Sequence, residues 1–171
     1  MRRTPPHPVN PHIRNTYMGD LYLNLRRKNR FRWFTRMIEH VLCMEICFPI
    51  PDHLYIPHPY GILGCSAAKV AEDVTLMQFT LLGPKDPWYQ GESLENLYPT
   101  LEEGVYVSAG AKVLGPITIG QWSVIGANAV VTEDIPPFST VFGQNRILRA
   151  GDGAPPQVKK YLESRGKGLA K

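Results

Sequence analysis

The stretch LEEGVYVSAGAKVLGPITIGQWSVIGANAVV, residues 101–131, decides the fold because a branched aliphatic residue occupies every sixth position. These positions are Leu101, Val107, Val113, Ile119, Ile125 and Val131. A period of six fits neither an α-helix nor a long alternating strand. It fits a triangular coil in which each hexapeptide supplies one flat side and one corner, with the aliphatic residue pointing inward. We therefore predict stacked parallel strands wound into a prism.

A second inward position follows four residues after each aliphatic one and holds a small or aliphatic side chain. Its members are Val105, Ala111, Ile117, Ser123, Ala129 and Ile135. Upstream the period continues as Ile50, Ile56 and Ile62, and after a two-residue slip as Val70, Leu76 and Leu82. We place the slip at residues 63–69 and the end of the coil near Pro136-Pro137.

Three regions follow from this pattern. Residues 1–44 form a proline-rich arm and two short helices, broken near Lys28 to Arg30. Residues 45–149 form the coil, from which residues 83–99 leave as a loop whose aromatic content favours a function. Residues 150–171 form a tail with a short helix from Gln157 onward.

Composition sets the broad class. With 43% hydrophobic and 20% charged residues, the chain suits a single globular domain. Cys43, Cys47 and Cys65 are interpreted as buried apolar fillers in a reducing compartment, and the N-terminus lacks a signal-peptide pattern. We therefore expect a cytoplasmic protein without nucleic-acid partners. The net charge of +4 gathers largely in residues 26–36, which indicates a solvated helix face or attraction to an anionic or lipid-linked substrate.

A resemblance covers roughly residues 45–149. The segments Leu54 to Ile62, Val74 to Gly83 and Gly104 to Asp134 resemble the serine acetyltransferase branch of the hexapeptide-repeat acyltransferases. The resemblance implies a left-handed parallel β-helix, an all-β fold here flanked by short helices. It also implies a homotrimer that uses acetyl-CoA and no metal, with His58 at the catalytic position.

His58 suits that role because an attacking alcohol or amine must lose a proton, and imidazole titrates near neutral pH. A carboxylate usually holds the other ring nitrogen. Glu45 resembles the family's acidic residue one coil earlier, with a spacing two residues shorter than expected, and Asp52 is the alternative. His53 does not match the motif and is interpreted as structural.

The resemblance also implies that acetyl-CoA lies along a groove between adjacent β-helices of the assembly, where small residues let the ligand approach the backbone. The groove positions are Ser108, Ala109, Gly110, Ala111, Gly126 and Ala127. Lys112, Arg146 or Arg149 would meet the phosphates. The small residues are equally well explained by corner packing.

The sequence departs from the family where the acceptor binds. Leu97-Tyr98-Pro99 stands in place of Arg-His-Pro, and Pro57 replaces the acidic residue before the catalytic histidine. Because these changes remove the partners of an amino acid's carboxylate and ammonium, we expect a saccharide hydroxyl as acceptor, on a surface-polysaccharide precursor. Acceptor residues would be Tyr98, Trp88, Tyr89 and Gln78. Serine O-acetylation, amino-sugar N-acetylation and a non-catalytic β-helix scaffold are the alternatives. Zinc hydrolysis needs three histidines, whereas the coil holds His53 and His58.

Overall fold

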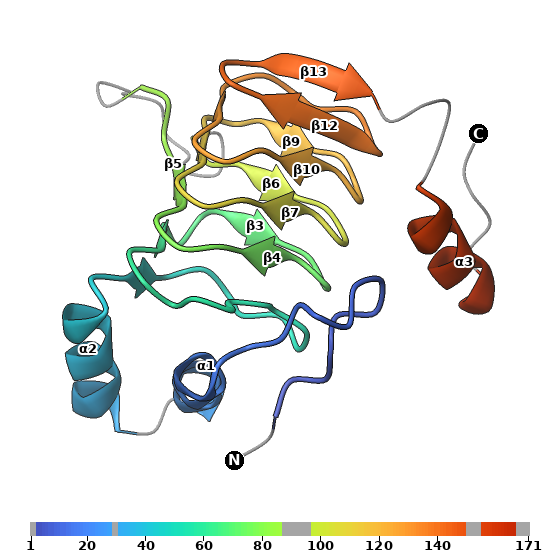
Figure 1. The fold of residues 1–171 in the computed structure, drawn as a ribbon. Helices are drawn as coiled ribbons and strands as arrows, with labels where there is room; N and C mark the ends of the chain where they lie inside the picture. The colour runs from blue at the N-terminus through green and yellow to red at the C-terminus, as the bar shows by residue number, and fades with distance from the viewer. Residues whose placement is uncertain (1–2, 29–30, 87–96, 150–154, 167–171) are drawn as a thin grey trace.

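Three parallel sheets form the faces of a prism in the computed structural model, which describes residues 3–28, 31–86, 97–149 and 155–166 (Figure 1). Sheet I contains β1 (Glu45–Ile46), β2 (Leu63–Gly64), β5 (Leu81–Gly83), β8 (Lys112–Leu114) and β11 (Val130–Val131). Sheet II contains β4 (Thr75–Leu76), β7 (Tyr106–Val107), β10 (Val124–Ile125), β12 (Ser139–Phe142) and β13 (Arg146–Arg149). Sheet III contains β3 (Lys69–Val70), β6 (Thr100–Leu101) and β9 (Thr118–Ile119). The chain visits sheets III, II and I in turn, as expected for a coil of hexapeptides.

The predicted inward positions form the core. All six aliphatic residues from Leu101 to Val131 are at most 1% exposed, and the second inward positions are buried as well. Ser123 is the polar member of that set. Its hydroxyl donates to the carbonyl of Pro136 at 3.0 Å and accepts from the amide of Ser139 at 3.1 Å. The buried hydroxyl is thereby satisfied and ties two neighbouring coils together.

The two-residue slip lies elsewhere than predicted. Tyr55 pairs with Thr75, and Leu63 pairs with Leu81. Between these two pairings the lower coil advances by eight residues, whereas the upper coil advances by six. The extra residues therefore lie in the corner 57–61 and not in 63–69. Ile62 is still fully buried, but it fills the second inward position, beside Thr80. The corner that contains His58 is thus a bulge in an otherwise regular coil.

Two helices close the lower end of the prism: α1 (Tyr17–Lys28) and α2 (Arg32–Val41). The sequence predicted two short helices in this region, without their place against the prism. The Tyr22 hydroxyl donates to Oε1 of Glu39 at 2.9 Å and joins them. Arg26 donates to the carbonyl of Ile46, and Arg27 donates to the carbonyl of Pro51 at 2.6 Å. Part of the basic cluster therefore holds the first coil in place by binding its backbone.

The coil continues past Pro136-Pro137, contrary to expectation. Strand β12 pairs in parallel with β10, and β13 then returns antiparallel to β12. Because β13 runs in the opposite direction, it ends the parallel stacking. The terminal helix α3 (Pro156–Ser164) packs beside the prism through Val158 and Leu162, which contact Trp122.

The cysteines are not buried fillers. Cys43 and Cys47 are exposed, Cys65 is partly exposed, and all three are free thiols. In the described parts of the chain, no helix is long and apolar enough to cross a membrane.

Candidate active site

His58 lies on the bulged corner between sheets II and I, with its side chain exposed. Its neighbours Pro57 and Pro59 are buried, and the His58 carbonyl accepts a hydrogen bond of 2.8 Å from the Tyr60 amide. Gly61 ends the corner with φ of 60°, where an added Cβ would lie 2.4 Å from the Phe79 ring. The two anchored prolines and this glycine present the imidazole to solvent on a well-defined backbone.

Glu45 is the first residue of β1 and pairs with Leu63 of β2. It therefore lies at the edge of sheet I that the chain enters directly after the His58 corner. Its carboxylate accepts a hydrogen bond of 3.4 Å from the Cys47 thiol. Burial and this bond raise the pKa of Cys47, so the thiol stays protonated and donates. Glu45 and His58 both lie in the described part of the chain, and no ion pair joins them there.

Asp52 lies one corner of the coil away from His58. Its amide and that of His53 donate to the carboxylate of Glu72 at 3.2 and 2.8 Å, at the corner between sheets III and II. Residues 54–56 separate this corner from the corner that contains His58. The choice between Glu45 and Asp52 as the partner of His58 stays a prediction, and the backbone position favours Glu45.

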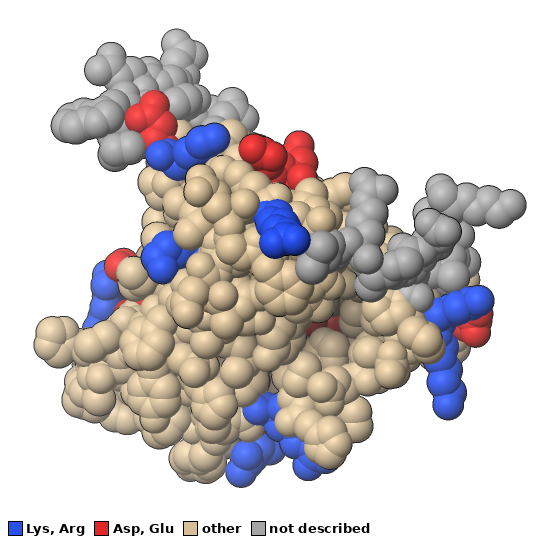
Figure 2. All heavy atoms as spheres, turned by 45° about the horizontal axis from the view of Figure 1, so that its top comes forward, with Lys and Arg blue, Asp and Glu red and all other residues tan. Residues whose placement is uncertain are grey.

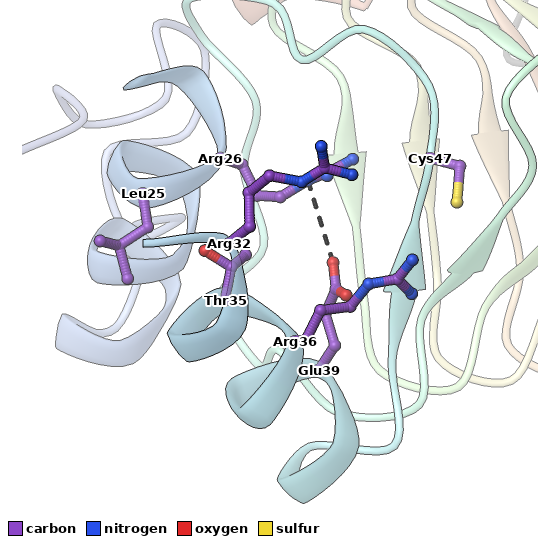
Figure 3. Close-up of a pocket in the computed structure, with 7 residues that line it drawn as sticks. All are labelled: Leu25, Arg26, Arg32, Thr35, Arg36, Glu39 and Cys47. Carbon is purple, nitrogen blue, oxygen red and sulfur yellow. Dashed lines mark ion pairs between the residues drawn. The ribbon is translucent and has the colours of Figure 1, made fainter. Parts of the chain in front are cut away.

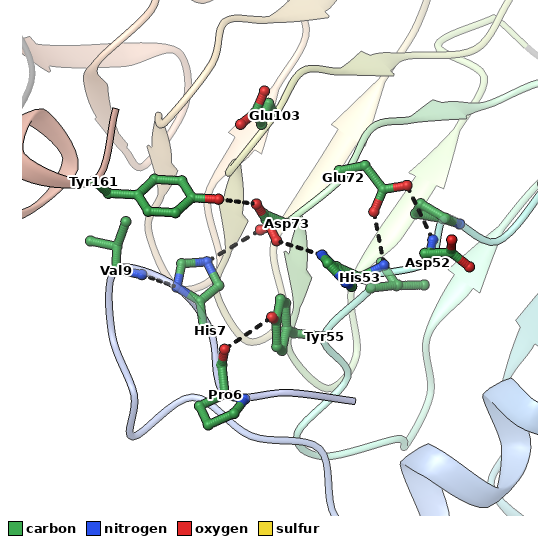
Figure 4. Close-up of polar contacts among 12 residues, drawn as sticks. Pro6, His7, Val9, Asp52, His53, Tyr55, Glu72, Asp73, Glu103 and Tyr161 are labelled. Carbon is green, nitrogen blue, oxygen red and sulfur yellow. Dashed lines mark hydrogen bonds and ion pairs between the residues drawn. The ribbon is translucent and has the colours of Figure 1, made fainter. Parts of the chain in front are cut away.

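His53 belongs to a polar cluster centred on Asp73, a buried residue that sequence reasoning missed (Figure 4). The Asp73 carboxylate lies 3.5 Å from Nδ1 of His53 and accepts a 3.0 Å bond from the Tyr161 hydroxyl. Its backbone carbonyl lies 3.2 Å from Nε2 of His7. Because the partners come from the N-terminal arm and α3, no local sequence pattern could reveal the cluster. Its contacts give it a structural role.

The predicted donor groove follows two stacked corners, 108–111 and 126–129. The Asn128 amide donates to the carbonyl of Ala109 at 2.9 Å, and the Gly110 amide donates to that of Gln78 at 2.9 Å. Ala127 is exposed, whereas Ser108, Ala109 and Gly110 are half-buried. Ala111 and Gly126 are buried, so Ala111 packs in the core and Gly126 lies close to the Phe142 ring. These two positions belong to corner packing.

The predicted phosphate ligands are partly accessible. Lys112 is exposed and its Nζ donates to the carbonyl of Gly110 at 3.1 Å. Arg146 is exposed on β13. Arg149 ends that strand, and its side chain lies outside the described residues. On the face seen in Figure 2, charged side chains are scattered and form no single large patch.

The predicted acceptor residues lie in two places. Gln78 lies on the corner directly above Tyr60, and its buried Oε1 has no hydrogen-bond partner in the described chain. Tyr98 hydrogen-bonds the Cys65 thiol, and burial together with this bond raises the pKa of Tyr98. Tyr98 and Cys65 lie at the corner between sheets I and III, at the opposite edge of sheet I from His58. Trp88 and Tyr89 lie outside the described residues.

Comparisons with known proteins connect this geometry to a family. Residues 98–133 match the model described as bacterial transferase hexapeptide (six repeats). The chain is 37% identical over 122 residues to a serine acetyltransferase of Bacillus subtilis, covering 68% of this chain and 54% of that protein. It is 34% identical over 106 residues to that of Escherichia coli, covering 61% and 37%. The chain therefore spans about half or less of these curated relatives' length.

The chain belongs to the hexapeptide-repeat acyltransferases and resembles serine acetyltransferases. Solved structures agree. A Brucella abortus serine acetyltransferase aligns with a TM-score of 0.60 and 26% identity, covering 77% of this chain and 54% of that one. A Neisseria gonorrhoeae serine acetyltransferase in complex with serine aligns with a TM-score of 0.57 and 28% identity, covering 72% and 49%. These neighbours confirm the left-handed β-helix.

The expectation of a saccharide acceptor is wrong. The curated relatives of this hexapeptide-repeat protein quoted above are serine acetyltransferases, and one aligned structure contains serine itself. The expectation rested on the missing Arg-His-Pro motif and on Pro57. Loss of individual ligands in one segment does not by itself indicate a different acceptor class, because another element can supply equivalent charges.

Proposed function

We propose that the chain is a serine O-acetyltransferase that uses acetyl-CoA as donor and His58 as general base. The observation that carries this proposal is the bulged corner, which exposes one imidazole beside the edge of sheet I in a chain whose relatives are serine acetyltransferases. Glu45 at that edge is the carboxylate best placed to orient the imidazole.

The reaction balances with one base. As the serine hydroxyl oxygen attacks the thioester carbonyl carbon, its proton passes to His58. The carbon–sulfur bond then breaks, and the departing thiolate takes the proton from the imidazolium. The products are O-acetylserine and free CoA, and no acyl-enzyme forms. The raised pKa of Tyr98 makes that residue a poor competing base.

The donor would lie along the stacked corners 108–110 and 126–127, where small side chains leave backbone groups accessible. Lys112 and Arg146 are exposed cations at this part of the prism and suit phosphate groups. A structural neighbour, a serine acetyltransferase solved in complex with CoA, aligns with a TM-score of 0.53 and 28% identity, covering 74% of this chain and 51% of that one.

The working state would be a homotrimer. Tyr60, Phe79 and Phe142 lie along the corner between sheets II and I and are 50%, 62% and 47% exposed. A column of exposed aromatic side chains suits burial against another chain. Such packing would also bring a second wall to the groove beside His58, and Tyr98 could then reach a site only across the interface. We propose a cytoplasmic location, because free, exposed thiols suit a reducing compartment.

The direct test is release of CoA thiol from acetyl-CoA, measured with serine, threonine, a panel of sugars and no acceptor. We expect serine-dependent release, with O-acetylserine identified by mass spectrometry. Release with sugars and none with serine would overturn the proposal, and so would absence of release with every acceptor.

A further inference from the structure

A hollow lies between α2 and the lower edge of sheet I. Its larger part, about 510 Å³, is lined by Arg36, Glu39 and His40 of α2 and by residues 43–45 and Leu63 of the coil. A narrower part of about 250 Å³ lies between α1, α2 and Cys47 (Figure 3). Both parts share Arg36 and Glu39. The two parts therefore meet at these two side chains of α2.

This hollow adjoins the His58 corner. The Gly61 amide, at the end of that corner, donates to the Leu42 carbonyl at 2.9 Å, which places Gly61 directly above the end of α2. Glu45 and Leu63, both lining residues, are register partners in sheet I. A small molecule in the hollow would therefore lie beside the edge that the His58 corner leads into.

The charges in the hollow complement an α-amino acid. Arg36 projects into it, is exposed, and forms no ion pair within the described chain (Figure 3). Glu39 is only 8% exposed, and its Oε1 accepts from Tyr22 and lies 3.9 Å from Nε of Arg26. Arg26 is also held by the Ile46 carbonyl, so it belongs to the scaffold. In the larger part of the hollow, Arg36 is thus the arginine available for a ligand, next to a buried carboxylate.

We propose that α2 binds the acceptor, with Arg36 pairing with the carboxylate of serine and Glu39 lying next to its ammonium group. This inference rests on the proposed function and deepens it. It explains how a chain with Leu97 and Pro57 can hold an amino acid, because a cation and an acid on α2 replace the missing ones. Guanidinium suits this role, since it can bind a carboxylate through two parallel hydrogen bonds.

The test combines one substitution with two acceptors. Arg36→Gln should raise the Michaelis constant for serine about 10-fold to 100-fold, in the range of a lost charged hydrogen bond, and leave that for acetyl-CoA unchanged. Serinamide has no carboxylate, so its kcat/KM should be equal in parent and variant. Arg36→Lys should recover part of the affinity for serine. Arg14→Gln is the matched control, since it removes the same charge from an exposed position that lines neither part of the hollow.

Each result has one meaning. If the parent acetylates serine and Arg36→Gln binds it as tightly, the inference is overturned while the proposed function stands. Equal losses in Arg14→Gln and Arg36→Gln would show a general effect of positive charge and would also overturn the pairing. If the parent acetylates no serine, the proposed function fails first. Calorimetric titration of serine into the parent and into Arg36→Gln then measures serine binding without any acetyl transfer. Equal affinities, or no binding to the parent, overturn the inference.

Discussion

The Tyr161 hydroxyl donates a 3.0 Å hydrogen bond to Oδ2 of Asp73, and this bond joins α3 to a corner of the β-helix 88 residues away. Asp73 is 2% exposed and lies 3.5 Å from His53 on its other oxygen. A buried carboxylate needs such partners, because leaving it unpaired is costly. The bond is therefore a specific restraint on the terminal helix.

Tyr161→Phe should lower the free energy of unfolding by about 1.5–3 kcal/mol, the typical contribution of a hydrogen bond to a charged group. Urea titration followed by circular dichroism measures the change. Tyr17→Phe is the control, since Tyr17 is 59% exposed and its hydroxyl forms no hydrogen bond in the described chain. Equal stability of the two variants would show that the Asp73 contact contributes nothing.

His7 predicts a dependence of stability on pH. Burial lowers the pKa of His7, and although the carbonyl and charge of Asp73 act in the opposite direction, the net shift is downward. Nδ1 accepts from the amides of Val9 and Asn10, so protonation there would break both bonds. Between the lowered folded pKa and the usual value near 6.5, the unfolded chain binds more protons. This stabilisation is complete above about pH 6.5 and is lost as the pH falls.

The measurement is the melting temperature at pH 7.5 and at pH 5 for the parent and for His7→Asn. We expect a smaller difference between the two pH values in the variant, whatever its absolute stability. His12→Asn, at an exposed position of the same arm, should behave like the parent. The idea fails if His7→Asn shows the parental difference.

The inward position of every sixth residue predicts that adjacent residues contribute differently to the free energy of unfolding. Ile125 is fully buried, whereas its neighbour Val124 is 37% exposed. Ile125→Ala should cost about 2–5 kcal/mol through lost transfer energy and the cavity left behind. Val124→Ala should change stability by about 0.5 kcal/mol or less. Denaturant midpoints give both values, and similar costs would contradict the inward assignment of Ile125.

His58→Ala should lower turnover by about two to four orders of magnitude, the usual contribution of a general base. Binding of CoA, measured by calorimetry, should be unchanged, because the stacked corners do not depend on the imidazole. His12→Ala should retain parental turnover. A His58→Ala protein with full activity would refute the assignment of the base.

Phe79→Asn should weaken the trimer. Phe79 is 62% exposed and has φ of 61°, a conformation that asparagine tolerates, so the substitution removes apolar area without straining the backbone. Sedimentation velocity should show a lower mass at micromolar concentration. Trp33→Asn removes an exposed aromatic residue from α2 and should leave the mass unchanged. Sedimentation of the parent protein as an active monomer would contradict the proposed homotrimer.

The sequence by itself determined the β-helix and the residues inside it. A side chain at every sixth position meets the same environment in every coil, so residues such as Ile119 and Ile125 report their burial through their spacing alone. The prediction that His58 is the base also came from sequence, because its motif is continuous along the chain. The helices α1 and α2 and the break between them followed from local periodicity.

Tertiary structure decided where the regular period fails and which distant side chains meet. The bulge at His58 shows only when Tyr55 is paired with Thr75 and Leu63 with Leu81, since an inward Ile62 satisfies either register. Arg36 reaches the edge of sheet I because α2 packs beneath it, and Asp73 gathers partners from both ends of the chain. A periodic pattern encodes burial because each coil repeats its neighbour. Contacts between non-repeating elements depend on how those elements pack, which no local spacing records.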